Sequence, residues 1–401
     1  MNITDLVDFK IRCTGCTACA SVCEPKSINM KKNEEGFLFP QVNENLCVDC
    51  GKCLSVCSIN NDTKFSKHSL SEIYAFQADD YDLLMNSTSG GLFPVLANNV
   101  IKQGGVVFGA TYNDEMSVVH SCAETEIDVK KFHGSKYVQS ELGDTFKSVE
   151  AYLKQNKLVL FSGTPCQING LKLFLGKQYD NLLTVDVICY GVPGELFFKK
   201  YIELIENKES AKVIDFKFRD KHKYGWSHTV VITFKNTNGK VYSKIYGNEY
   251  NNLWYRAWKH CDCLRESCYN CEFVSNNRVS DFTIGNFWGI GEVSDSFNVK
   301  NGVSLLAVNN KEKYNFYAEL KNSGIFEEQD NSMLEKYQHG LSTRKERTGK
   351  RDSFYINVAG GYMNLINSLY PLGLKDKIMF SVPIRFQKTV IGIAKKIGGI
   401  K

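Results

Sequence analysis

Hydrophobic and polar positions in the central part of the chain form two kinds of run. Short apolar runs rich in β-branched residues predict buried strands at 104–112, 157–162 and 181–191. Amphipathic runs with apolar residues at helical spacing predict helices at 143–155 and 195–207. Because predicted strands alternate with predicted helices, we expect an α/β domain with a mostly parallel sheet.

The pattern changes in the next segment, where three runs have the composition of antiparallel strands. These runs cover 212–218, 227–236 and 240–246. The dipeptide Asn238-Gly239 separates the last two runs, and Asn-Gly is a strong signal for a β-hairpin turn. An antiparallel insertion is therefore expected, and the predicted fold class is α/β and α+β.

Differences in composition predict three domains. The N-terminal segment is dense in cysteine, and the polar stretch Ser58–Ser71 that follows it has the composition of a linker. The end of the chain is basic. We therefore expect a small cysteine-rich domain at 1–65, a larger mixed α/β domain at 66–340 and a basic C-terminal extension at 341–401.

Length and charge narrow the class of protein. A chain of 401 residues that is 43% hydrophobic can bury a sizeable core. Charged residues interrupt the first twenty positions, so we expect neither a signal peptide nor a membrane span, and we expect a cytoplasmic protein. Residues 341–401 carry a net charge of +9 and the rest of the chain sums to −4, which together give +5, so no nucleic-acid partner is expected for the whole chain.

Eight of the fifteen cysteines form two runs with the spacing C-x2-C-x2-C-x3-C. The first run is Cys13, Cys16, Cys19 and Cys23, and the second is Cys47, Cys50, Cys53 and Cys57. This spacing is typical of a dicluster ferredoxin domain with two 4Fe-4S clusters, in which the fourth thiolate of each run binds the other cluster. Cys57 should therefore complete the first cluster and Cys23 the second. Zinc is the alternative, but zinc sites usually use two C-x2-C pairs for each ion.

Four glycine-rich stretches follow the cysteine-rich segment, at 86–93, 133–143, 161–172 and 185–194. Two of them come directly after predicted buried strands, and ligands of open α/β sheets bind at the carboxyl ends of strands. Each stretch alone is a weak signal, because small polar loops are often ordinary turns. Together they predict a cofactor that carries phosphate.

The chain resembles the beta subunits of coenzyme F420-reducing hydrogenases and dehydrogenases, a family that includes plant hydroxymethyl-chlorophyll reductase. The resemblance covers about residues 10 to 291 and is strongest for bacterial members often found with surface-polysaccharide genes. It lies in the two cysteine runs and in the stretches NEEGFLFPQV, STSGG, GSKYVQS, FSGTPCQINGLK, DVICYGVPG, FRDKHKYGW, SCYNC and SDFTIGNFWGI. One position departs from the family pattern, because Asn286 stands where an acidic residue is usual.

The resemblance implies FAD in the second domain. Matched residue by residue, its binding loops are Ser87, Thr88, Ser89, Gly90 and Gly91, then Ser135, Lys136, Tyr137 and Gln139, then Gly163 and Thr164. Backbone N–H groups and hydroxyls of such loops suit a pyrophosphate, and Lys136 would supply a compensating positive charge. A solvated surface lysine is the alternative for Lys136.

Four further cysteines lie close together in CDCLRESCYNCEF, and they have two readings. Cys261, Cys263, Cys268 and Cys271 alone would make a four-thiolate site, possible for zinc. The resemblance runs through GTPC, ICYG and SCYNC, and implies that Cys166 and Cys189 join Cys268 and Cys271 in a third 4Fe-4S cluster. Cys263 is then a reserve ligand, Cys261 a spare thiol and Cys122 a small buried hydrophobe.

These cofactors predict an enzyme that transfers electrons. Clusters carry single electrons while organic acceptors take two, and a flavin converts between the two modes. We expect reduced ferredoxin or another carrier protein as donor, and as acceptor F420 or a metabolite, for example of a polysaccharide pathway. Candidate residues near the acceptor are Lys136, His133 and Lys221, with His222, Tyr224 and Trp226. The alternative is a non-catalytic electron-transfer subunit of a hydrogenase or dehydrogenase complex.

The C-terminal stretch PIRFQKTVIGIAKKI predicts a basic amphipathic helix. Phe386, Val390, Ile393 and Ile397 fall at helical spacing, with Arg385, Lys388, Lys395 and Lys396 on the remaining surface. Such a helix can lie on anionic lipid, which would place the protein at the inner face of the membrane. The alternative is an ordinary docked helix or a frayed basic end.

Overall fold

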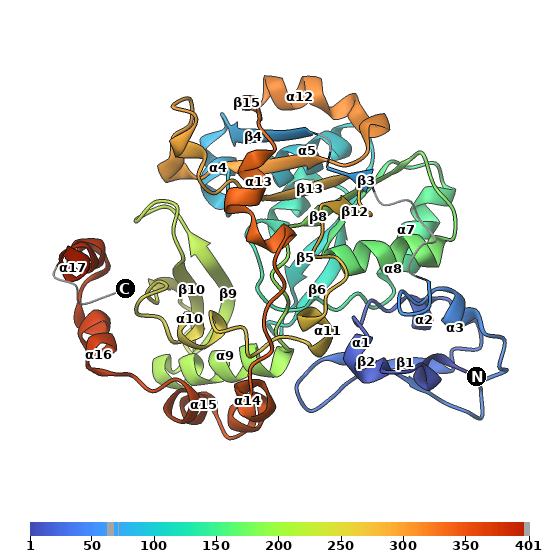
Figure 1. Cartoon of the computed structure of the whole chain (residues 1–401), viewed down its shortest axis with the longest axis horizontal. Helices are drawn as coiled ribbons and strands as arrows, with labels where there is room; N and C mark the ends of the chain where they lie inside the picture. The colour runs from blue at the N-terminus through green and yellow to red at the C-terminus, as the bar shows by residue number, and fades with distance from the viewer. Residues whose placement is uncertain (62–67, 71, 397–401) are drawn as a thin grey trace.

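An eight-stranded mixed sheet is the centre of the fold in this computed structural model, which describes residues 1–61, 68–70 and 72–396 (Figure 1). Its strands are β4 (Glu72–Ala78), β5 (Val106–Tyr112), β6 (Val118–Ala123), β7 (Val159–Gly163), β8 (Leu182–Val187), β13 (Phe282–Asn286), β14 (Ser304–Val308) and β15 (Gly324–Gln329). Their order across the sheet is β15-β4-β14-β13-β8-β7-β5-β6. The strands predicted at 104–112, 157–162 and 181–191 are confirmed as β5, β7 and β8.

The sheet is mixed, so the expectation of a mostly parallel sheet is wrong. Only the three pairings that join β13, β8, β7 and β5 are parallel. The other four pairings, at the two flanks, are antiparallel. The physical reason lies in the connections: only residues 113–117 join β5 to β6, which is too short for a parallel crossover.

The strand directions bring five loops to one edge of the sheet. β4 and β13 are both antiparallel to β14, so β4 runs in the same direction as β13, β8, β7 and β5. The carboxyl ends of these five strands therefore lie on one side, where ligands of open α/β sheets bind.

Helices cover both faces of the sheet. α5 (Leu92–Lys102) packs on one face with β-strand residues such as Val107 and Leu160. α7 (Thr145–Lys154) and α8 (Pro165–Leu175) pack on the other face with the alternate residues Phe108 and Phe161. Successive strand residues point to opposite faces, so an unbroken apolar strand serves two cores. α7 and α9 (Glu195–Glu209) confirm both predicted helices.

The predicted antiparallel insertion is confirmed as a three-stranded sheet. It consists of β9 (Ala211–Asp220), β10 (Thr229–Asn236) and β11 (Val241–Ile245), in the order β11-β10-β9. The hairpin turn contains Gly239 at a φ of 77°, which a residue without a side chain adopts easily.

This insertion shares one aromatic core with helices from other parts of the chain. The helices are α9, α10 (Leu253–Trp258), α14 (Lys350–Ala359) and α15 (Tyr362–Leu369). Phe197 and Trp254 stack at the centre with ring centroids 4.3 Å apart. Residues 350–370 of the expected C-terminal extension are thus part of this core.

The cysteine-rich segment forms a small unit beside α8 (Figure 1). It contains the hairpin β1 (Ile28–Lys32) and β2 (Leu38–Val42) and the short helices α1 (Phe9–Arg12), α2 (Ala18–Ser21) and α3 (Lys52–Ser55). The expected linker at 58–71 lies partly outside the described residues. β3 (His68–Ser69), within that stretch, pairs with β12 (Asn277–Arg278).

The remaining helices are short. They are α4 (Tyr81–Asn86), α6 (Glu126–Val129), α11 (Glu266–Tyr269), α12 (Tyr317–Asn322), α13 (Ser332–Tyr337) and α16 (Leu374–Ser381), with 3-10 turns Ile3–Asp5, Lys130–Phe132, Ile290–Glu292, Val299–Asn301, Lys311–Phe316 and His339–Leu341.

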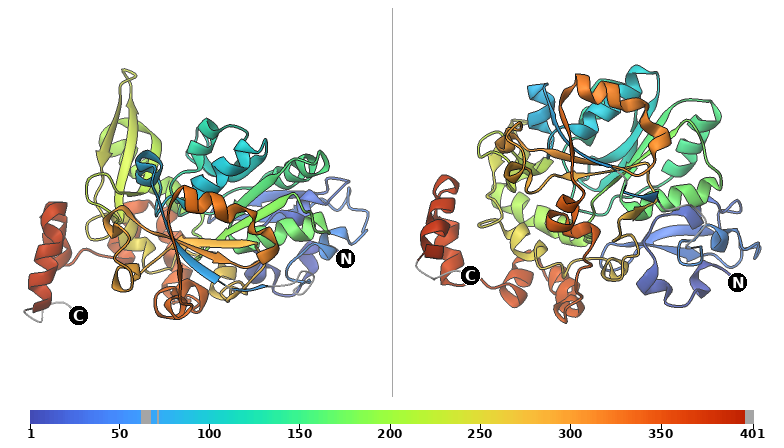
Figure 2. Two further views of the ribbon diagram at one scale, coloured as in Figure 1. Left: turned by 90° about the horizontal axis from the view of Figure 1, so that it is seen from above. Right: turned by 45° about the horizontal axis from the view of Figure 1, so that its top comes forward.

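The predicted C-terminal helix is α17 (Ile384–Lys396). Figure 2 shows α16 and α17 standing at the edge of the molecule, away from the large sheet. Phe386 is exposed, and Ile397 of the predicted apolar stripe lies outside the described residues. Within the part of the chain that the structure describes, no helix is long and apolar enough to cross a membrane.

Candidate metal centres and cofactor site

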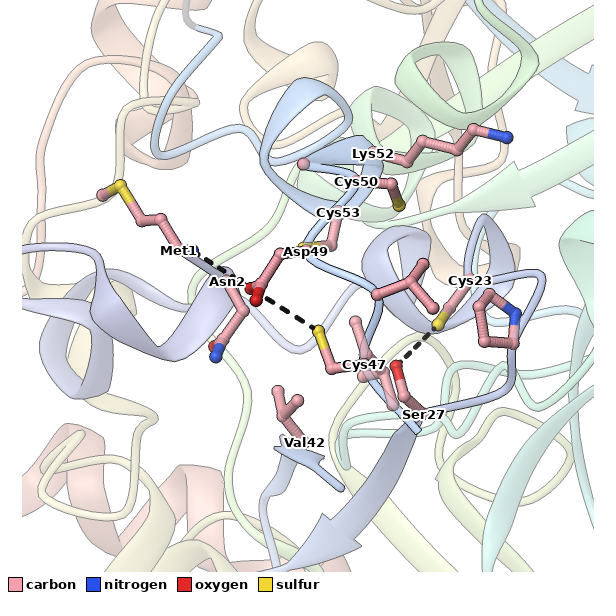
Figure 3. A pocket seen from close by; sticks show the side chains of 14 residues that line it. Met1, Asn2, Cys23, Ser27, Val42, Cys47, Asp49, Cys50, Lys52 and Cys53 are labelled. Atoms are coloured by element: carbon pink, nitrogen blue, oxygen red, sulfur yellow. Dashed lines mark hydrogen bonds and ion pairs between the residues drawn. The ribbon is translucent and has the colours of Figure 1, made fainter. Parts of the chain in front are cut away.

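The eight N-terminal cysteines line two separate hollows, which we call the inner and the outer pocket. Cys13, Cys16, Cys19 and Cys57 line the inner pocket. Cys23, Cys47, Cys50 and Cys53 line the outer pocket, part of which Figure 3 shows. Each pocket thus holds three cysteines of one run and the fourth of the other, as the spacing predicts.

The inner pocket is buried against the α/β domain. Burial raises the pKa of the Cys16 and Cys19 thiols and raises that of Cys57 to about 12. Burial has this effect because it disfavours the charged thiolate. Bound iron would offset that cost by coordinating the thiolates directly, so the donor set and its surroundings fit a cluster.

The outer pocket faces solvent. Cys50 is exposed, and the Cys47 thiol lies 3.9 Å from the Asp49 carboxylate. In the nearby ion pair, the Lys52 ammonium lies 2.6 Å from the Glu24 carboxylate; Lys52 is half exposed and Glu24 is largely exposed. Surface pairs of this kind contribute little to stability.

Four of the later cysteines come together at the carboxyl edge of the sheet, and we call them the third set: Cys166, Cys189, Cys268 and Cys271. Cys166 is in the first turn of α8, and Cys189 follows β8. Gly191, two residues after Cys189, lies against Cys268, where an added Cβ would approach the Cys268 Cβ to 3.2 Å. A β-bridge between Pro193 and Leu264 joins the two segments.

The thiols of the third set also interact electrostatically. Burial raises the pKa of Cys166, and the neighbouring Cys189 and Cys271 add to this effect. The pKa of Cys189 rises to about 12 through burial and then Cys268, and that of Cys268 rises to about 12 through burial and then Cys166. The structure therefore brings all four together.

The other cysteines of CDCLRESCYNCEF belong to a different environment. Cys263 is fully buried in the aromatic core, and its backbone carbonyl accepts a hydrogen bond of 2.6 Å from the Tyr355 hydroxyl. Cys261 packs at the border of the same core, and Cys122 packs at the border of the core beneath α7. Among the described residues, no three His, Cys, Asp or Glu side chains are grouped tightly enough for a single metal ion.

α8 connects the inner pocket to the third set. Gly170, one turn after Cys166, is so close to Cys16 that an added Cβ would lie 2.9 Å from its Sγ. Cys16 is also among the charges that raise the pKa of Cys166. The inner pocket is therefore adjacent to the third set.

The predicted cofactor loops contact one another at the carboxyl edge. The Ser135 backbone N–H donates to the Thr88 hydroxyl at 2.7 Å. The Gln139 N–H donates to the Pro193 carbonyl at 3.3 Å, which joins the second loop to the fourth. Gly90 has a packing role, since an added Cβ would lie 2.0 Å from the Phe76 carbonyl oxygen.

Two predicted polar residues of this region have strongly shifted pKa values. The Lys136 ammonium donates to the carbonyls of Lys131 and His133, at 3.1 and 2.9 Å, and burial lowers its pKa to about 8. Burial, reinforced by Lys136, lowers the pKa of His133 to about 4.

Lys221 is fully buried and holds the first cofactor loop. Its ammonium donates to the carbonyls of Leu84, Ser89 and Asn301 at 2.6 to 2.7 Å, and burial lowers its pKa to about 7. All three N–H donors of the lysine are used in this way. Contact between Lys221 and an acceptor stays a prediction.

Sequence reasoning missed a buried arginine beside the first cofactor loop. The Arg219 guanidinium lies 5.2 Å from the Trp288 ring, which stacks on Trp226 at 4.8 Å. Trp226 donates its indole N–H to the Thr88 carbonyl at 3.1 Å. Arg219 Nη2 is buried without a hydrogen-bond partner in the described structure. Arg219 lies in FRDKHKYGW and Trp288 in SDFTIGNFWGI, but the sequence of these stretches does not distinguish a buried arginine from an exposed one.

Arg265 and Arg278 were also missed, and both lie among the cysteines. Arg278 pairs with Asp186 at 2.9 Å, and both side chains are buried. Arg265 lies between the inner pocket and the third set, and it donates to the Cys13 carbonyl at 2.6 Å. A contact such as that from Arg265 to Cys13, across more than two hundred positions, leaves no local signal in the sequence.

The comparisons with known proteins concern both parts of the chain. Residues 12–61 match the 4Fe-4S dicluster domain, and residues 156–333 match the family described as the C terminus of the beta subunit of coenzyme F420 hydrogenase/dehydrogenase. No curated protein sequence matches the chain. Among solved structures, a chain of the F420-reducing NiFe hydrogenase complex from Methanosarcina barkeri is similar, with a TM-score of 0.42 and 15% identity. That match covers 78% of this chain and 96% of the other.

The two family matches agree with the arrangement of the cysteines. The pockets lined by Cys13 to Cys57 lie within the first matched range, and the third set lies within the second. The chain therefore contains a 4Fe-4S dicluster domain at residues 12–61 and, at residues 156–333, a domain of the coenzyme F420 hydrogenase/dehydrogenase beta subunit family.

Proposed function

We propose that this chain is an iron–sulfur flavoprotein oxidoreductase with three 4Fe-4S clusters and FAD. Single electrons enter from a carrier protein such as reduced ferredoxin, pass through the clusters, and leave in pairs to an organic acceptor. The acceptor is F420 or a metabolite. The observation that carries the proposal is the position of the third set, next to the inner pocket and at the edge where the predicted cofactor loops meet.

The third set supports a 4Fe-4S cluster through its donor chemistry. It offers four sulfur ligands from three separate segments, and soft thiolates are the usual ligands of iron–sulfur clusters. Arg278 is near Cys189 and Cys271 and stabilises their thiolate forms.

The surroundings of the first cofactor loop support FAD. The stacked pair Trp226–Trp288 and the partly unpaired Arg219 offer aromatic surface and a positive charge next to Thr88. These are groups that suit a large aromatic cofactor with phosphates. A flavin, when bound, accepts electrons singly and releases them in pairs. Lys221 holds the backbone of this loop in place.

Quantification of cofactors tests the proposal. The full chain is purified without oxygen, and iron, sulfide and FAD are measured per chain. About twelve irons and one FAD are expected. About eight irons would overturn the third cluster, and absence of flavin after reconstitution with FAD would overturn the flavin.

A variant at Arg219 tests the cofactor pocket separately. Arg219→Met should lower the FAD content while the iron content stays unchanged, because Arg219 lies beside the loop and not among the cysteines. Lys223→Met, on the same segment, is the matched control and should retain FAD. Equal FAD in both variants would contradict the assignment of Arg219.

The second candidate is an electron-transfer subunit without its own acceptor site. It is favoured by the family description, which names a beta subunit. Turnover of F420 or another two-electron acceptor by the isolated chain would support the free-standing enzyme. Activity only after addition of a co-purifying partner would support the second candidate.

A further inference from the structure

Arg265 occupies the boundary between the inner pocket and the third set. Its guanidinium donates to the Cys13 carbonyl at 2.6 Å and to the Leu38 carbonyl at 2.9 Å. Nη2 also lies 3.6 Å from the Cys13 thiol, within the distance for a hydrogen bond to sulfur. On the other side, its backbone carbonyl accepts the Cys268 N–H at 2.9 Å. The residue is 1% exposed.

The charge of Arg265 has no carboxylate partner among the described residues. Its acceptors are two backbone carbonyls, the Cys13 thiol and the amide oxygen of Gln139, at 3.2 Å. Its flat face lies over the Phe39 ring at 4.2 Å. A buried guanidinium stays protonated, and burying it without a counter-charge is costly. The thiolates of a bound cluster in the inner pocket would supply the missing negative charge.

The outer pocket contains no equivalent group in the part of the chain described. The cations near it are Lys52, which is half exposed and paired with Glu24, and the Met1 ammonium, which is exposed and paired with Asp49. A solvent-screened charge acts more weakly on a cluster than a buried one does. The two clusters therefore have matching ligands but different electrostatic surroundings.

We propose that Arg265 raises the reduction potential of the inner cluster above that of the outer cluster. Reduction adds one electron and therefore one negative charge to the cluster, and no bond changes. The fixed positive charge beside Cys13 favours this reduced state. Electrons from a one-electron carrier protein then enter at the exposed outer cluster and move inward, toward the third set.

Redox titration of the full chain tests this role. The clusters are reduced stepwise with mediators and followed by low-temperature electron paramagnetic resonance, and a Cys50→Ser variant identifies the outer cluster. At a fixed solution potential, Arg265→Gln should lower the ratio of reduced to oxidised inner cluster about tenfold. This change corresponds to a shift in reduction potential of about 59 mV for one electron. The shift should be toward lower potential, with the outer cluster unchanged. Arg265→Lys, which keeps the charge, should restore most of the potential.

A second variant neutralises the charge without removing the arginine. Gln139→Glu would place a carboxylate at the guanidinium and should also lower the inner potential. Lys52→Gln removes one positive charge beside the outer pocket and is the matched control, with little expected change. If Arg265→Gln loses the inner cluster, the inner potential measured in Gln139→Glu tests the proposal instead. An unchanged inner potential in Gln139→Glu, or in a folded Arg265→Gln, would overturn the proposal.

This inference rests on the dicluster domain and not on the proposed flavin or acceptor. The titration needs neither turnover nor FAD. Its failure would leave the proposed oxidoreductase intact, and loss of the flavin proposal would leave the titration valid.

Discussion

The inner and outer pockets have the same ligand pattern and different surroundings. Each has three cysteines of one run and a fourth from the other. The inner pocket adjoins α8 and the buried Arg265, while the outer pocket includes the exposed Cys50. The difference shows that a repeated motif sets the type of cluster, whereas contacts from distant parts of the chain distinguish the two clusters.

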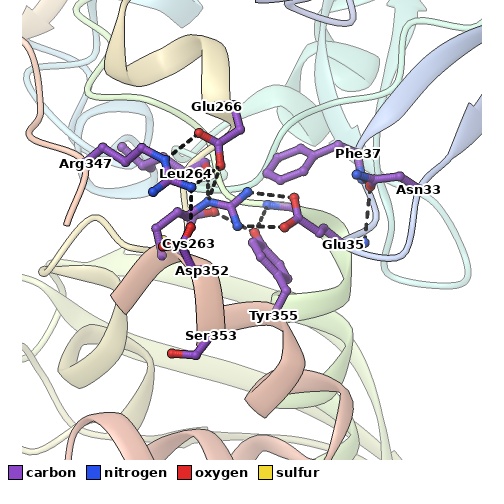
Figure 4. Close-up of polar contacts among 12 residues, drawn as sticks. Asn33, Glu35, Phe37, Cys263, Leu264, Glu266, Arg347, Asp352, Ser353 and Tyr355 are labelled. Atoms are coloured by element: carbon purple, nitrogen blue, oxygen red, sulfur yellow. Dashed lines mark hydrogen bonds and ion pairs between the residues drawn. The ribbon is translucent and has the colours of Figure 1, made fainter. Parts of the chain in front are cut away.

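Contacts with the rest of the protein also hold the inner side more firmly. Arg351 of α14 pairs with Glu35, in the turn between β1 and β2, through two contacts of 2.6 Å (Figure 4). The same guanidinium donates to the Leu264 carbonyl at 2.9 Å, close to Arg265 and Cys268. One side chain thus connects the dicluster domain, the segment of the third set and the C-terminal helices.

The largest expected effect is the loss of a whole cluster, which would interrupt the proposed electron transfer from the inner cluster to the third set. Cys268→Ser should lose about four irons while the two N-terminal clusters remain, because Cys268 belongs to the third set alone. Electrons would then reach the inner cluster and stop. Iron analysis and spectroscopy of the reduced protein check this result.

Cys261→Ser is the matched control for that variant. Cys261 lies in the same stretch but packs at the border of the aromatic core, so full iron content is expected. Full iron in Cys268→Ser, or an equal loss in both variants, would be incompatible with the third set as ligands.

The sequence predicted the parts of this comparison that depend on local spacing. Two runs of four cysteines were enough to predict the exchange of Cys57 and Cys23 between the pockets. The hairpin at Asn238-Gly239 and the helices α7 and α9 were also predictable, because turn chemistry and periodicity act over a few residues.

The sequence could not predict the contacts that make the pockets different. Arg265 and Arg351 reach Cys13 and Glu35 across more than two hundred positions, and only the tertiary fold brings them together. The mixed sheet was missed for a similar reason. Periodicity identifies β14 as an apolar run at best and does not identify β15, half of which is polar. The direction of both strands depends on connections that carry no strand signal.

The second effect concerns the stability of the inner side. Arg351→Met removes a bidentate contact with Glu35 and should lower the free energy of unfolding by about 3 kcal/mol. Arg351 is buried while Glu35 is partly exposed, so the lower end of the usual range for buried pairs is expected. Chemical denaturation of the reconstituted protein measures the change.

Arg347→Met is the matched control for this clamp. Arg347 pairs with Glu266 and Asp352 at the surface and is 38% exposed, so a loss within about 1 kcal/mol is expected. Equal decreases in the free energy of unfolding in the two variants would contradict a special stabilising role of the Arg351–Glu35 pair on the inner side.

The smallest effect comes from two glycines with almost the same backbone conformation, Gly15 at a φ of 70° and Gly51 at 71°. A side chain at either position costs about 1 kcal/mol of backbone strain. At Gly15 an added Cβ would also lie 2.9 Å from Arg265 Nη1 and 3.0 Å from the Leu38 carbonyl oxygen, whereas nothing lies within 4 Å at Gly51. Gly15→Ala should therefore destabilise the protein by about 1 to 2 kcal/mol more than Gly51→Ala. Chemical denaturation of both variants measures the difference in the free energy of unfolding. Equal stabilities would show that Arg265 and Leu38 can move aside at no energetic cost. Close packing at Gly15 would then not be a difference between the inner and the outer pocket.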